Sequence, residues 1–189
     1  IYSSYFDYFL NIESYIITLI FSLILGIVLF FLGKNSSKKI DFYEQVSLVI
    51  LIYLISAILI AIPYYLSNYQ ITLVDSLFEA YSGITGTGFS IFSNVKYLDP
   101  TLIIWRSSSQ WLGGLYFLFS LIILIDIFDK NLKDSFTDFS SFNNSETITQ
   151  SFKVLILYTL LTISIFVILK LINLRNLDAF NLSLTLISS

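Results

Sequence analysis

Thr85, Gly86, Thr87 and Gly88 form the stretch of this sequence best suited to chemistry, because they follow directly on a short apolar segment. Glycine readily adopts positive φ angles, so successive carbonyl oxygens of such a loop can point to one side. A ring of these carbonyls can replace the hydration shell of a potassium ion. A preceding helix would also turn the negative end of its dipole toward the cation. The open alternative is an ordinary turn between helices.

The composition indicates a membrane protein without redox or zinc chemistry. Of the 189 residues, 56% are hydrophobic and 12% charged, and the mean hydropathy is +0.82. Soluble domains carry about 25% charged residues. Cysteine and histidine are both absent, which removes disulfides, cysteine nucleophiles, the usual zinc sites and haem ligation by histidine. We therefore expect no cofactor and, since there is no basic patch, no nucleic acid partner.

Apolar stretches of two lengths alternate along the chain. Four are long enough to cross a hydrocarbon core, which takes about 20 residues: 15–33, 46–66, 102–128 and 152–172. Two are too short to cross, 73–84 and 177–187. Irregular backbone at membrane depth must be buried in protein or line a cavity. We therefore expect an all-α integral membrane fold of helix–pore loop–helix repeats, with about four transmembrane helices and two short re-entrant pore helices.

The basic residues predict an orientation, because loops rich in lysine and arginine stay in the cytoplasm. Six lysines fall on one predicted side: Lys34, Lys38, Lys39, Lys130, Lys133 and Lys153. Four basic residues fall on the other: Lys96, Arg106, Lys170 and Arg175. We therefore expect the N-terminus and both short segments to lie on the outer side.

A weak internal repeat relates the two short segments, since Asp178 follows Asp75 by 103 residues. The same shift places Ser189 on Gly86, so we expect the chain to stop inside a second pore loop. It begins on Ile1, which we do not expect to be a translation start. The predicted division is an N-terminal segment with one span and a basic loop (1–45), a first unit (46–128), a cytoplasmic loop (129–150) and an incomplete second unit (151–189). One loop cannot surround a cation, so we expect these residues alone not to transport potassium.

Two blocks carry a specific resemblance: FEAYSGITGTG at 78–88 and WRSSSQWLGG at 105–114. With them the chain resembles the TrkH-type membrane subunit of the Trk/Ktr/HKT superfamily of potassium transporters. The resemblance implies four helix–pore loop–helix units around one pore. It places the filter glycine on Gly88 and the preceding filter carbonyls on Gly86 and Thr87. We also expect filter backbone at Thr85 of the same loop and, through the 103-residue shift, at Ser189. Gly86 departs from the threonine usual in the family, which puts the rigidity of the loop in question.

The resemblance also implies a transport function, a membrane location and two partners. It implies potassium uptake across the cytoplasmic (inner) membrane by a multi-pass protein that is not an enzyme. A cytoplasmic nucleotide-binding regulatory subunit and a homodimer are the implied partners. Two other functions stay open: a polytopic membrane enzyme, such as a lipid-linked transferase that uses the acidic residues, and a membrane scaffold that transports nothing.

Several polar or small residues allow two interpretations. Arg106 either acts on cations near the pore mouth or, as we favour, reaches the interface or pairs with an acid such as Asp99. Glu79 either attracts cations or, as we favour, stabilises the loop by accepting backbone hydrogen bonds. Gly113 and Gly114 form either a hinge or, more commonly for small residues, a close helix contact.

Overall fold

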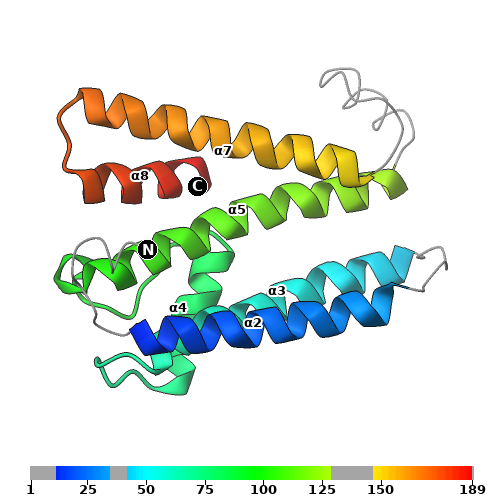
Figure 1. Cartoon of the computed structure of the whole chain (residues 1–189), viewed down its shortest axis with the longest axis horizontal. Coiled ribbons are helices and arrows are strands. Elements are labelled where there is room, and N and C mark those ends of the chain that lie inside the picture. The colour runs from blue at the N-terminus through cyan, green and yellow to red at the C-terminus, as the bar shows by residue number, and fades with distance from the viewer. Residues whose placement is uncertain (1–11, 35–41, 129–146, 189) are drawn as a thin grey trace.

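The computed structural model describes residues 12–34, 42–128 and 147–188, and every regular element among them is helical. Figure 1 shows these elements in chain order. They are α2 (Ile12–Gly33), α3 (Phe42–Tyr65), α4 (Leu73–Ile84), the 3₁₀ turn η1 (Val95–Tyr97), α5 (Pro100–Phe128), α7 (Thr147–Leu171) and α8 (Asn176–Ser188). The predicted all-α fold is confirmed.

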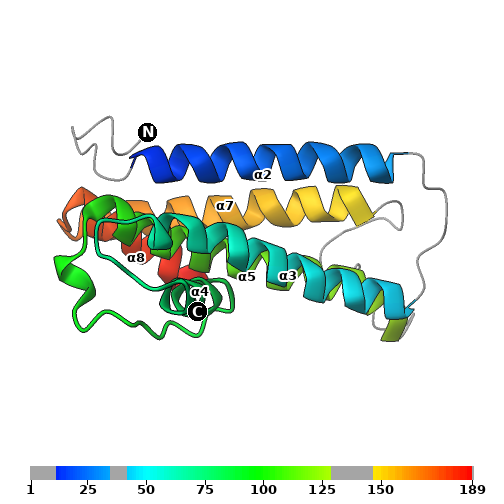
Figure 2. The ribbon, with the colours of Figure 1, turned by 90° about the horizontal axis from the view of Figure 1, so that it is seen from below.

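Four long helices run alongside one another, and the two short helices α4 and α8 lie toward the same end of the molecule (Figures 1 and 2). Among the described residues, three helical stretches are long and apolar enough to cross a membrane: Ile12–Gly33, Tyr43–Tyr65 and Ser151–Leu171. The fourth long helix, α5, has 29 residues but a polar first half. Its Ser107, Ser109 and Gln110 are buried against protein, so they need not face lipid.

The surface of α2 fits contact with lipid. Its large apolar side chains are mostly exposed, from 38% at Ile17 to 75% at Leu32, and only Ser14 and Thr18 are buried. Apolar surface of this extent on one helix is unusual for a soluble protein and typical of one that meets the acyl chains of a bilayer.

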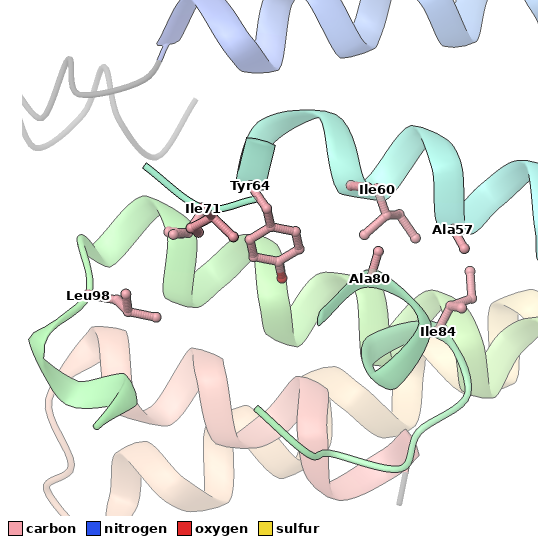
Figure 3. Close-up of a cluster of buried hydrophobic side chains, with 9 residues drawn as sticks. Ala57, Ile60, Tyr64, Ile71, Ala80, Ile84 and Leu98 are labelled. Atoms are coloured by element: carbon pink, nitrogen blue, oxygen red, sulfur yellow. The ribbon is translucent and has the colours of Figure 1, made fainter. Parts of the chain in front are cut away.

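The core lies where α3, α4 and the start of α5 meet, beside the loop that follows α4. Figure 3 shows Ala57, Ile60 and Tyr64 of α3 facing Ala80 and Ile84 of α4. The α3 residues recur at three- and four-residue intervals, which places them on one face of the helix. Packing in this cluster holds the C-terminal half of α4 in place, and so fixes the position of the loop that follows α4.

Candidate functional site

The short helix α4 ends inside the protein. Its 12 residues span about 18 Å, well short of the ~30 Å hydrocarbon core. Its N-terminus is capped by Thr72, whose hydroxyl accepts a hydrogen bond from the Asp75 amide at 3.2 Å. Toward the other end Glu79, Ala80 and the three residues 82–84 are buried. The N-terminus of α4 therefore lies toward one end of the molecule, and its C-terminus, the negative end of the helix dipole, lies at the loop.

Backbone angles alternate in sign along the loop. Thr85 closes α4 with φ −86° and Gly86 follows with φ +70°. Thr87 stays in the negative range, whereas Gly88 has φ +75°. Residues of opposite φ in succession can bring peptide N–H groups to one side of the backbone. The two glycines stand at the positions where the angle is positive, as the sequence predicted.

The hydrogen bonds of the loop agree with this arrangement. The amides of Thr85, Gly86 and Gly88 donate back to carbonyls of the last turn of α4, at 3.0, 3.0 and 3.3 Å. Within the described part of the chain, no donor reaches the carbonyl oxygens of residues 85–87. Thr85, Thr87 and Gly88 are exposed, and Gly86 is half-buried. Three carbonyls on exposed or half-buried residues thus lie at the end of a helix dipole without a donor.

Ser82, in the last turn of α4, holds the loop in place by hydrogen bonds. Its hydroxyl donates to the Phe89 carbonyl at 2.6 Å. Thr87 donates to the Ser82 carbonyl at 3.2 Å, and Thr85 donates to the Tyr81 carbonyl at 2.7 Å. The threonine hydroxyls are therefore used to fold the loop onto the helix. We did not single out Ser82 from the sequence; a small hydroxyl residue near the end of a half-length helix was the available signal.

A buried ion pair holds the far side of the loop. Glu79 is 1% exposed, and its carboxylate accepts from the Arg106 Nε at 2.6 Å. The same carboxylate accepts from the Ile91 amide at 3.0 Å and from the Ser90 hydroxyl at 3.1 Å. The structural interpretation of Glu79 is confirmed, since its bonds run to the backbone and side chains of the loop.

Arg106 connects α5 to the loop backbone as well. Its Nη2 donates to the Gly88 carbonyl at 2.7 Å and to the Phe89 carbonyl at 3.3 Å. The Gly88 carbonyl is therefore turned to a protein donor, unlike those of residues 85–87. The prediction that Arg106 pairs with an acid is confirmed, but Asp99 was the wrong acid. Asp99 lies just before α5, and its carboxylate instead accepts a hydrogen bond from the Thr101 hydroxyl in the first turn of that helix.

The second short helix reaches the same place. A Cβ added to Gly86 would lie 3.5 Å from the Ser188 carbonyl oxygen, so α8 ends beside the first loop (Figure 2). The predicted re-entrant segment 177–187 corresponds to α8, Asn176–Ser188. Ser189, the last predicted filter residue, lies outside the described residues.

Close packing also explains the two glycines of α5. A Cβ on Gly113 would lie 2.0 Å from the Ile84 carbonyl oxygen, and one on Gly114 would lie 3.1 Å from the Ser188 Cα. The close-contact interpretation of this pair is therefore confirmed.

A family model described as "TrkH: Cation transport protein" matches residues 11–187. The chain belongs to the TrkH family. One relative is the "Uncharacterized cation transporter MJ1485" of Methanocaldococcus jannaschii, 31% identical over 181 residues, which cover 93% of this chain and 37% of the relative. The "Trk system potassium uptake protein TrkG" of Escherichia coli is 26% identical over 53% of this chain and 21% of its own length.

A solved TrkH structure has the same fold. The crystal structure of the potassium transporter TrkH from Vibrio parahaemolyticus matches with a TM-score of 0.71 at 21% identity, over 92% of this chain and 35% of that chain. The chain thus spans about a third of the length of the Methanocaldococcus jannaschii relative and of the Vibrio parahaemolyticus TrkH. Together with the apolar helices, membership of the TrkH family makes this a multi-pass membrane protein of a transporter family.

Proposed function

We propose that the full-length protein takes up potassium, and that the loop after α4 supplies one wall of its selectivity filter. The observation that carries the proposal is the set of three carbonyls at residues 85–87, which no donor reaches in the described part of the chain. Such carbonyls can replace the water around a dehydrated cation. Gly88 contributes its backbone angle, and Ser189 would begin the matching wall of the second unit.

The choice of ion rests on the relatives. TrkG of Escherichia coli and TrkH of Salmonella typhimurium are both named as potassium uptake proteins. A carbonyl site needs no cofactor and no covalent step. Transport would be driven by the membrane potential, with or without a coupled ion. We place the protein in the cytoplasmic membrane, as a homodimer with a cytoplasmic nucleotide-binding regulatory subunit. The units 46–128 and 151–189 would each contribute a pore loop.

An uptake experiment tests the proposal. The full-length protein is expressed in a host that lacks its own potassium uptake, and rubidium influx is measured alone, with excess potassium and with excess sodium. We expect influx well above that of the empty vector, inhibited by potassium and little affected by sodium. Influx equal to the empty vector, in cells whose membranes contain the protein, would refute potassium transport.

A further inference from the structure

Two adjacent glycines of α5 each receive the end of a different pore helix. Gly113 faces the end of α4, where an added Cβ would lie 2.0 Å from the Ile84 oxygen and 2.6 Å from its carbonyl carbon. Gly114 faces the end of α8, where an added Cβ would lie 3.1 Å from both Cα and Cβ of Ser188. Consecutive helix residues point about 100° apart, so one dipeptide can contact two different helices.

The segment of α5 around these glycines is held from a third side by α7. The Tyr158 hydroxyl donates to the Trp111 carbonyl at 3.2 Å, and the Trp111 indole donates to the Thr162 hydroxyl at 2.9 Å. The two rings lie 5.1 Å apart. Since α7 leads directly into α8, these contacts fix the start of the second unit against the same turn of α5 that receives both pore-helix ends.

We infer that Gly113 and Gly114 are positioning residues for ion selectivity, because they set the distance between the loop after α4 and the end of α8. The inference rests on the proposed potassium filter. Ser188 connects the two sites, since its Cα lies against Gly114 while its carbonyl oxygen lies against Gly86 of the first loop. A methyl group at 114 would push the end of α8, and with it the Ser188 carbonyl beside Gly86, away from α5. Both the width of the filter and the field of its carbonyls depend on that separation.

The test uses Gly114→Ala in the full-length protein, because the nearest backbone atom would lie 3.1 Å from its Cβ, whereas a Cβ at 113 would lie 2.0 Å from a backbone oxygen. We expect the preference for rubidium over sodium to fall about tenfold, equivalent to about 1.4 kcal/mol in the difference between the two ions. The amount of inserted protein should stay close to that of the wild type. Gly26→Ala in α2 is the matched control, since nothing lies within 4 Å of a Cβ there.

A double variant tells whether the loss of selectivity comes from the contact with α8 or from the contact with α7. A Cβ on Gly114 would also lie 2.5 Å from the Tyr158 hydroxyl, which Tyr158→Phe removes. We expect Gly114→Ala/Tyr158→Phe to insert and to keep the loss of selectivity, because the contact with Ser188 remains. The inference is overturned if Gly114→Ala keeps wild-type selectivity, if the double variant restores it, or if the double variant does not insert. A wild-type protein without selective uptake would instead refute the proposed function.

Discussion

Replacing Arg106 by glutamine should release the loop after α4 from α5. The change removes a bond of 2.6 Å to Glu79 and bonds of 2.7 and 3.3 Å to the Gly88 and Phe89 carbonyls. Bonds to a charged group contribute about 1.5–3 kcal/mol each, but three from one guanidinium do not simply add.

The larger cost comes from the carboxylate that stays behind. The Glu79 side chain has no exposed surface and the Arg106 side chain is 14% exposed. Removing one partner of a buried ion pair costs about 3–5 kcal/mol, because the other charge is left without compensation. We therefore expect Arg106→Gln to lower the free energy of unfolding by about that amount. Glu79→Gln/Arg106→Gln removes both charges, so it should recover part of the loss, with a coupling energy of about 1–3 kcal/mol.

The second unit offers a matched control. Arg175 bonds Asp178 at 2.7 Å, but its side chain is 84% exposed. Water screens such a pair, so Arg175→Gln should change neither stability nor transport measurably.

The assay is a denaturant titration of the purified full-length protein in detergent, alongside rubidium uptake in competition with sodium. Arg106→Gln should be less stable than the wild type and less selective, because the Gly88 carbonyl loses its donor. The reasoning is refuted if Arg106→Gln matches Arg175→Gln in both measurements.

Three further variants or labels test other parts of the account. Gly88→Val forces a β-branched residue to φ +75°, at a cost of about 1–2 kcal/mol, so uptake should stop or lose selectivity while the protein still inserts; unchanged uptake would remove Gly88 from the filter. Ser82→Ala deletes the 2.6 Å hydroxyl bond to the loop, and thermal unfolding should show a loss of about 1 kcal/mol; wild-type stability would argue against this role of Ser82. Cysteines at Lys38 and Lys133 should react only from the cytoplasm and one at Asn94 only from outside, and outside labelling at 38 would reverse the orientation.

The helices could be predicted from the sequence because their signals are local. The apolar stretch 73–84 coincides with α4, Leu73–Ile84, and 177–187 lies within α8, Asn176–Ser188. Hydropathy and length decide these bounds without reference to the rest of the chain. Glycine permits the positive angles at Gly86 and Gly88, but residue type alone does not fix them, since Gly113 and Gly114 lie within α5.

The partners of the polar residues could not be predicted, because they depend on packing. Asp99 is the acid nearer to Arg106 in the sequence, yet Glu79, 27 residues away, forms the pair. The core between α3, α4 and α5 brings the buried half of α4 alongside α5. No local sequence pattern predicts that these two helices pack together. For the same reason the sequence left Gly113 and Gly114 open between a hinge and a close contact.

The most direct test of the central claim is to locate the ion. Crystals of the full-length protein grown with thallium or rubidium ions would show the cation by its anomalous scattering. The account predicts a peak beside the carbonyl oxygens of Thr85, Gly86 and Thr87, displaced when potassium is added. Anomalous peaks elsewhere in the pore and none beside this loop would contradict it.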